Sequence, residues 1–204
     1  MNYELAYRIG FHPWEEALHQ QPFVASLSKL LDAEERAREK PYGRALDLGT
    51  GSGIWAIELA KRGWNVTGVD LVDKALERAD HRAREAGVSV RFLKADVTNL
   101  EVSRIGSDFR LLLDTGTFHG LRPAERETVG RQVDAVAAPD ATLLVLAWAR
   151  RRRGPLPRGV DCDEIAAAFP RWQVTDTGPT GFQAPKPVEL LLQPDEHWYQ
   201  LRRP

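Results

Sequence analysis

Residues 45–55 read ALDLGTGSGIW, an apolar run that ends in glycines at positions 49, 51 and 53, with an acid, Asp47, two residues before the first glycine. Glycine packs no side chain and weakens a strand, so this spacing indicates a backbone that turns tightly or lies against a ligand. We therefore expect a buried strand that ends at Gly49, a tight loop, and a helix whose unpaired amide groups face the same place.

Apolar strands and helical segments alternate along most of the chain. Strands are expected in the stretches RALDLG, NVTGVD, VRFLKAD, FRLLLDTG, ATLLVLAW and WQVTDT, and a final edge strand is expected in HWYQLRR. Strands that alternate with helices indicate βαβ units, and continuously apolar strands indicate burial on both faces. The sequence therefore predicts an α/β fold with a mostly parallel sheet and helices on both of its faces.

This alternation fills residues 42–204, which we expect to form a single compact domain. Residues 1–41 are expected to form an irregular aromatic segment followed by a helix that Pro22 opens. The apolar residues of that helix share one face, and its charged end, DAEERAREK, is expected to be solvated.

The composition limits the classes of function. The 204 residues carry 28 basic and 29 acidic side chains, so the net charge of −1 provides no general attraction to nucleic acid or to an anionic membrane. The single cysteine, Cys162, excludes an intramolecular disulfide and a multi-cysteine metal site, and we expect no metal. The start has no long apolar run and no later stretch is long enough to span a bilayer, so we expect a cytoplasmic protein without a membrane partner.

Two interpretations of the glycine-rich stretch compete. GSGIWA satisfies the dinucleotide pattern G-x-G-x-x-G/A, and Asp70 follows at a suitable distance. Acids also end three successive expected strands, at Asp47, Asp70 and Asp96. A dinucleotide brings a pyrophosphate, which an acidic pocket repels, whereas a positively charged ligand suits such a pocket. The three acids therefore disfavour an NAD-dependent oxidoreductase.

The stretch DLGTGSG closely resembles motif I of the class I S-adenosylmethionine-dependent methyltransferases, and the resemblance extends over about residues 42–150. It implies a Rossmann-like fold with a seven-stranded sheet whose last strand is antiparallel. It also implies S-adenosylmethionine as cofactor, S-adenosylhomocysteine as product, and methyl transfer as the activity.

The same resemblance implies a role for each motif residue. The residues that would line the methionine part of the cofactor are Gly49, Thr50, Gly51 and Gly53, with Asp47 supporting their loop. Asp70 and Leu71 would face the ribose, and Asp96 and Val97 would face the adenine. Asp114, at the end of LLLD, would lie between cofactor and acceptor.

The acceptor side is expected in LLLDTGTFHGL. Methyl transfer from a sulfonium is an in-line displacement, and a general base is needed only when the acceptor must lose a proton. By analogy Thr115, Phe118 and His119 lie over the methyl group, and His119 and Asp114 are the candidate catalytic residues. Alternatively, His119 bonds a backbone group and shapes the loop, and Phe118 packs in the interior rather than acting as a cation–π partner. Trp148 either lines the acceptor pocket or packs in the core at a strand end.

The N-terminal stretch YRIGFHPWEEA contains a Pro-Trp element that resembles the start of thiopurine, halide and tellurite-type methyltransferases. This resemblance implies that Trp14 covers the cofactor and that Tyr7 and His12 face the acceptor. The alternative is that Trp14 packs the first helix onto the core. The glycine and proline residues of the stretch suit a lid.

The favoured acceptor is a small molecule with an oxygen, sulfur or halide-type nucleophile, because the chain has no separate substrate domain. An RNA or protein methyltransferase is supported only by the arginine run 150–153, which we expect to be a solvated loop, so nucleic acid is not expected as a partner. A catalytically silent module that senses the cofactor stays open. The sequence does not distinguish a monomer from a homodimer.

Overall fold

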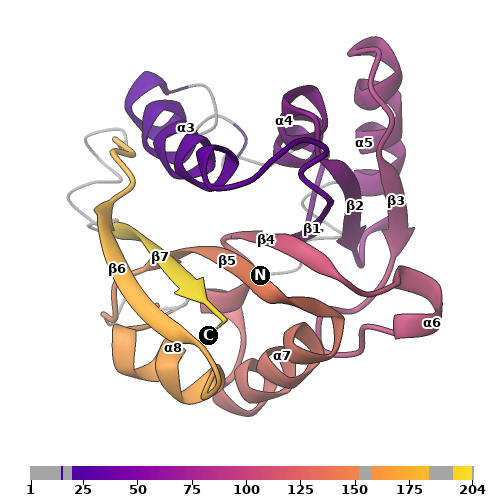
Figure 1. Cartoon of the computed structure of the whole chain (residues 1–204). Coiled ribbons are helices and arrows are strands. Elements are labelled where there is room, and N and C mark those ends of the chain that lie inside the picture. The colour runs from indigo at the N-terminus through magenta and orange to yellow at the C-terminus, as the bar shows by residue number, and fades with distance from the viewer. Residues whose placement is uncertain (1–14, 16–19, 152–157, 184–194, 204) are drawn as a thin grey trace.

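Seven strands from the described residues form one sheet, in the order β3-β2-β1-β4-β5-β7-β6, in this computed structural model (Figure 1). The structure describes residue 15 and residues 20–151, 158–183 and 195–203. The strands are β1 (Arg44–Leu48), β2 (Asn65–Asp70), β3 (Arg91–Lys94), β4 (Phe109–Thr115), β5 (Ala137–Trp148), β6 (Gln173–Pro179) and β7 (Glu196–Arg202).

The helices of the described part lie on both faces of this sheet. They are α3 (Gln21–Arg36), α4 (Ile54–Arg62), α5 (Asp73–Glu85), α6 (Val102–Ile105), the 3-10 turn η1 (Phe118–Gly120), α7 (Pro123–Val136) and α8 (Cys162–Ala168). Figure 1 shows α3, α4 and α5 on one side of the sheet and α7 and α8 on the other. In the part that the structure describes, no helix is long and apolar enough to cross a membrane.

The strand directions confirm the expected mostly parallel sheet with an antiparallel last strand. Strands β1 to β5 pair in parallel, and β7 is antiparallel to both β5 and β6. The strand order reverses between β1 and β4, which is the point at which open α/β sheets bind ligands beyond the carboxyl ends of the strands.

The expectation that HWYQLRR forms an edge strand is wrong. Strand β7 lies between β5 and β6 and pairs with both of them. Its side chains Trp198, Tyr199 and Leu201 are buried, whereas most side chains of β6 are exposed. The mostly polar strand β6 therefore takes the edge, where one side of the strand faces water.

The two faces of the sheet bury two separate apolar clusters. Leu111 and Leu113 of β4 pack with α3 and α4, whereas Leu112, between them, packs with α7 and α8. Successive side chains of a strand point to opposite faces, so a continuously apolar strand serves both clusters. This confirms that the apolar runs are strands buried on both sides.

Helix α3 packs its expected apolar residues, Phe23, Leu27 and Leu31, into the cluster that contains Trp198. The expectation that its charged end is solvated is wrong for Glu34, because the side chain of Glu34 is only 1% exposed. The Glu34 carboxylate accepts hydrogen bonds from Thr142 Oγ1 of β5 (2.8 Å) and from Gln200 Nε2 of β7 (2.6 Å). These bonds join α3 to two strands of the sheet. The boundary between residues 1–41 and the domain of residues 42–204 stays a prediction.

Candidate functional site

The acids at the ends of the first strands lie along the border of the sheet that the carboxyl ends of the parallel strands form. In the parallel pairs, Asp47 of β1 stands opposite Gly68 of β2, and Asp70 of β2 stands opposite Lys94 of β3, two residues before Asp96. Asp114 of β4 stands opposite Leu48 of β1. The parallel register therefore brings four carboxylates to the carboxyl ends of four adjacent strands.

The loop between β1 and α4 has the backbone conformation that its glycines suggest. Gly49, Gly51 and Gly53 adopt φ values of 68°, 53° and 79°, which other residues rarely adopt. A Cβ atom on Gly49 would also stand 1.9 Å from Thr117 Oγ1, and one on Gly53 would stand 2.7 Å from Ala79 Cβ. Both the left-handed turns and the close contacts therefore require glycine in this loop.

Asp47 lies beneath the glycine loop and is 1% exposed. Its Oδ2 atom accepts a hydrogen bond from Thr50 Oγ1 (2.6 Å), while its Oδ1 atom has no hydrogen-bond partner among the described residues. Burial raises the pKa of Asp47 to about 7, and the nearby carboxylates of Asp114 and Asp70 add to this effect. Asp47 thus supports the loop through Thr50 and keeps one unsatisfied oxygen.

Asp70 connects the end of β2 to the same loop. Its Oδ2 atom accepts a hydrogen bond from the Gly51 amide (2.8 Å), and its Oδ1 atom accepts one from the Val72 amide (2.9 Å). Burial raises the pKa of this half-buried carboxyl, against the hydrogen bonds, which lower it. Leu71, the next residue, is 57% exposed, which is unusual for so large an apolar side chain.

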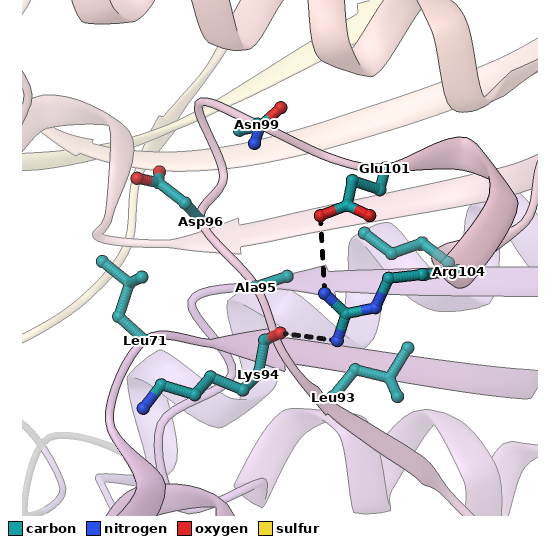
Figure 2. A pocket seen from close by; sticks show the side chains of 9 residues that line it. Leu71, Leu93, Lys94, Ala95, Asp96, Asn99, Glu101 and Arg104 are labelled. Carbon is teal, nitrogen blue, oxygen red and sulfur yellow. Dashed lines mark hydrogen bonds and ion pairs between the residues drawn. The ribbon is translucent and has the colours of Figure 1, made fainter.

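A cavity of about 200 Å³ lies beside the ends of β2 and β3. Figure 2 shows Leu71 and Asp96 on one side of it and Glu101 and Arg104 on the other. The Asp96 carboxylate accepts hydrogen bonds from the amide (2.8 Å) and hydroxyl (2.7 Å) of Thr98 through Oδ1. The remaining lining residues are Leu93, Lys94, Ala95, Asn99 and Ile105.

Val97 and Phe118, two expected contact residues, have their side chains in the core. Val97 is 8% exposed and belongs to the cluster under α7. Phe118 is 1% exposed and packs against the ring of Phe169 with 5.4 Å between centroids. The turn η1 directs the Phe118 side chain into the apolar interior, which fits the packing alternative, and its contact with the acceptor stays a prediction.

Asp114 organises the loop that follows β4. It is 3% exposed, and its carboxylate accepts hydrogen bonds from the amides of Gly116 (3.0 Å), Thr117 (2.8 Å) and Phe118 (3.0 Å). Burial raises its pKa to about 6. The carboxylate is thus engaged by its own loop, next to the half-buried Thr115, and its catalytic role stays a prediction.

His119 and Trp148 come together although 29 positions separate their numbers in the sequence. Their rings stack with 5.1 Å between centroids and an angle of 14°. Trp148 Nε1 donates a hydrogen bond to Glu196 Oε1 (2.6 Å), and the buried Arg126 donates one to the His119 carbonyl (2.9 Å). His119 is 7% exposed, so its ring is held at the ends of β4 and β5.

The expected lid residues Tyr7, His12 and Trp14 lie outside the described residues, as do Arg152 and Arg153. Arg150 and Arg151 are exposed, in agreement with a solvated loop, and Arg150 pairs with Asp161 (3.1 Å). Sequence reasoning missed Glu15, which reaches Ser52 of the glycine loop. An acid directly after the Pro-Trp element was the only available signal for it.

The chain is similar to known methyltransferases. Residues 45–140 match a family model described as a methyltransferase domain. The chain is 30% identical over 152 residues to the 2-heptyl-1-hydroxyquinolin-4(1H)-one methyltransferase of Mycobacteroides abscessus, a match that covers 71% of this chain and 65% of that protein. The chain thus spans less than two thirds of that relative's length.

Two solved structures share the fold. One is the 1,6-didemethyltoxoflavin-N1-methyltransferase of Burkholderia thailandensis with bound 1,6-didemethyltoxoflavin and S-adenosylhomocysteine (TM-score 0.73, 21% identity, 99% of this chain and 85% of that one). The other is the N-methyltransferase NodS of Bradyrhizobium japonicum in complex with S-adenosylhomocysteine (TM-score 0.71, 17% identity, 94% and 92%). At these identities the likeness is one of fold.

Proposed function

We propose that the chain is a class I S-adenosylmethionine-dependent methyltransferase and that it transfers a methyl group from S-adenosylmethionine to a small-molecule acceptor. The observation that carries this proposal is the row of carboxylates at the ends of β1, β2 and β3, beside a cavity edged by the exposed Leu71. A cationic ligand with an apolar ring system suits such a place better than a pyrophosphate does.

The residues of the site fit this cofactor in charge and in shape. The buried Oδ1 atom of Asp47 has no hydrogen-bond partner in the described part of the chain, and a ligand's ammonium group, reached directly or through water, would supply one. In the proposed assignment the glycine loop receives the methionine part, Asp70 the ribose hydroxyls, and Asp96 the adenine amino group. Leu71 would face the ribose beside Asp70.

When bound, S-adenosylmethionine would supply a methyl group whose carbon accepts the nucleophile and whose leaving group is the sulfur of S-adenosylhomocysteine. The work left to this chain is to hold the acceptor close, to align it, and to exclude water. We assign the acceptor side to the loop that Asp114 organises and to the stacked pair His119 and Trp148. For an acceptor that must lose a proton, His119 is the proposed base, and Trp148 fixes the plane of its ring.

Calorimetric titration tests the cofactor assignment. Purified protein is titrated with S-adenosylhomocysteine and, separately, with NADH. We expect saturable binding of the first and none of the second, because the acidic strand ends repel a pyrophosphate. Binding of NADH alone would contradict the proposal.

A product screen then identifies the acceptor class. Thiols, iodide, phenols and catechols are each incubated with protein and S-adenosylmethionine, and the S-adenosylhomocysteine formed is measured. We expect turnover with at least one small nucleophile. Turnover only with RNA or protein substrates would contradict the small-molecule assignment.

A further inference from the structure

We propose that Glu15 is a cofactor-positioning residue: with Arg82 it holds the Ser52 hydroxyl, and through Ser52 it keeps the glycine loop in the conformation that receives the cofactor. The inference rests on the proposed function. It adds a residue from the start of the chain and one from α5 to a site otherwise built from the ends of the strands.

Three side chains from three segments form a closed ring of hydrogen bonds. Ser52 Oγ donates to Glu15 Oε1 (2.6 Å), and Arg82 Nη2 donates to Glu15 Oε2 (3.0 Å). Arg82 Nη1 also donates to Ser52 Oγ, which closes the ring. Glu15 and Ser52 are 9% and 3% exposed, while the Arg82 side chain is 31% exposed, so water competes least for the bond between Ser52 and Glu15.

The glycine loop needs such an anchor because its backbone is unusually free. Ser52 stands between Gly51 and Gly53, both in the left-handed region, and two flanking glycines leave many conformations open to an unsupported loop. The backbone bonds of the loop include the Gly51 amide to Asp70 and the Gly53 amide to the Thr50 carbonyl (2.9 Å). The side chain of Ser52 adds a further hydrogen-bonded connection, to Glu15 and to Arg82 of α5.

Helix α5 supports the loop at two neighbouring points. Gly53 lies so close to Ala79 that a Cβ atom on the glycine would meet the alanine Cβ at 2.7 Å. Arg82 follows Ala79 by three residues, so it lies on the same face of the helix, about one turn further along. The contact with Ala79 sets the distance between loop and helix, and the Glu15–Ser52–Arg82 ring sets the orientation of the loop.

The charges in this ring favour the ionised carboxylate. Glu15 also pairs with Arg78 (3.5 Å), so two guanidinium groups face one carboxylate. Burial raises the pKa of Glu15, but the hydrogen bonds from Ser52 and Arg82 and the two positive charges outweigh burial, so the net shift is downward. Charge-assisted bonds of this kind are stronger than neutral ones. Removing the carboxylate would free Ser52 and leave Arg82 without this partner beside the loop.

The test is the affinity for S-adenosylhomocysteine of Glu15→Ala, Glu15→Gln and Arg82→Met, measured by calorimetry on variants whose circular dichroism matches the wild type. We expect the Kd to rise about tenfold or more for Glu15→Ala and Arg82→Met. Glu15→Gln, which keeps an acceptor for Ser52, should lose less. The matched control is Arg84→Met on the same helix, because Arg84 is 67% exposed and pairs only with Asp80 among the described residues; its Kd should not change.

A double variant separates a shared role from two independent ones. If Glu15 and Arg82 act through Ser52 as one unit, Glu15→Ala/Arg82→Met binds no more weakly than the weaker single variant. Variants that lose thermal stability but keep the wild-type Kd would overturn the inference, because the ring would then only join segments. An equal loss in Arg84→Met would overturn it as well. A wild-type chain that binds no S-adenosylhomocysteine overturns the proposed function, and this inference with it.

Discussion

Three carboxylates, Asp47, Asp70 and Asp114, are buried or half-buried at the carboxyl ends of adjacent strands, and they differ in their hydrogen-bond partners. Asp47 has one hydroxyl partner, Asp70 has two backbone amides, and Asp114 has three amides of its own loop. Burial raises the pKa of all three, which means that the ligand-free protein holds these charges at a cost in free energy. A bound cation offsets part of that cost.

Replacing Asp70 with alanine should weaken the binding of S-adenosylhomocysteine by about 1–3 kcal/mol, because the Gly51 amide and, in the proposed assignment, a ribose hydroxyl would lose their acceptor. Calorimetry measures the change. Asp80→Ala on α5 serves as the control, since Asp80 is 53% exposed and should leave the Kd unaltered. An Asp70→Ala protein with wild-type affinity would mean that the ribose lies elsewhere.

Asp47 should make the ligand-free protein less stable as the pH rises through neutrality. Burial raises its folded-state pKa from 3.8 to about 7, so its contribution is fully present below the lower value and is lost as the pH passes the higher one. Asp47→Asn cannot ionise. The difference in free energy of unfolding, variant minus wild type, should therefore increase by about 1 kcal/mol or more between about pH 5 and about pH 8. Urea unfolding across this pH range provides the measurement. If the free energies of unfolding of variant and wild type change in parallel with pH, the raised pKa of Asp47 is contradicted.

At the scale of elements, the loops beyond the strands keep their shape because helices approach them closely. Helix α7 supplies Arg126, which donates to the carbonyl of His119 in η1, and α7 itself packs against α8. The contact between α7 and α8 leaves no room for a side chain at Gly130, where a Cβ atom would stand 1.8 Å from the Ala168 carbonyl oxygen. The position of the acceptor loop thus depends on a helix pair behind it.

Gly130→Ala should lower the free energy of unfolding by about 1–3 kcal/mol, because the methyl group forces α7 and α8 apart. Gly120→Ala is the control, since an added Cβ there meets no described atom within 4 Å and the backbone φ is not in the left-handed region. Urea unfolding should therefore show a lower free energy of unfolding for Gly130→Ala than for Gly120→Ala. Equal losses would show that α7 and α8 adjust without strain.

In the whole molecule, helix α3 packs against strand β7, although the two elements lie far apart in the sequence. Trp198 of β7 donates to Ser26 Oγ of α3 (2.9 Å), and its ring lies 5.8 Å from that of Phe23. The carboxylate of Glu34 joins the same two elements, with Arg38 and Arg202 as its ionic partners. The sheet that carries the site is therefore complete only when residues about 170 positions apart have met.

Glu34→Ala should destabilise the fold by about 3–5 kcal/mol, because Arg38, whose side chain is 7% exposed, would be left as a buried charge without its carboxylate. Chemical unfolding measures this change. The control is Asp140→Ala, which removes the exposed partner of Arg110 and should change stability by less than about 1 kcal/mol. A similar small effect for both would mean that water readily enters the Glu34 cluster.

Features that depend on neighbouring residues could be predicted from the amino-acid sequence. Three glycines with an acid before them specify a strand, a left-handed loop and a helix, because only glycine adopts those φ values readily. Acids at the ends of successive strands had to meet at one edge, since parallel strands end on the same side. The alternation of strands and helices then predicted the α/β fold.

Contacts between distant segments became known only from the folded structure. It placed β7 inside the sheet, buried Glu34, turned Phe118 into the core and brought Glu15 to Ser52. Local patterns report which side chains prefer burial, but they carry no information on which remote partner will satisfy a polar group. A buried carboxylate is stable only beside its partners, and those partners become neighbours only when the whole sheet has formed.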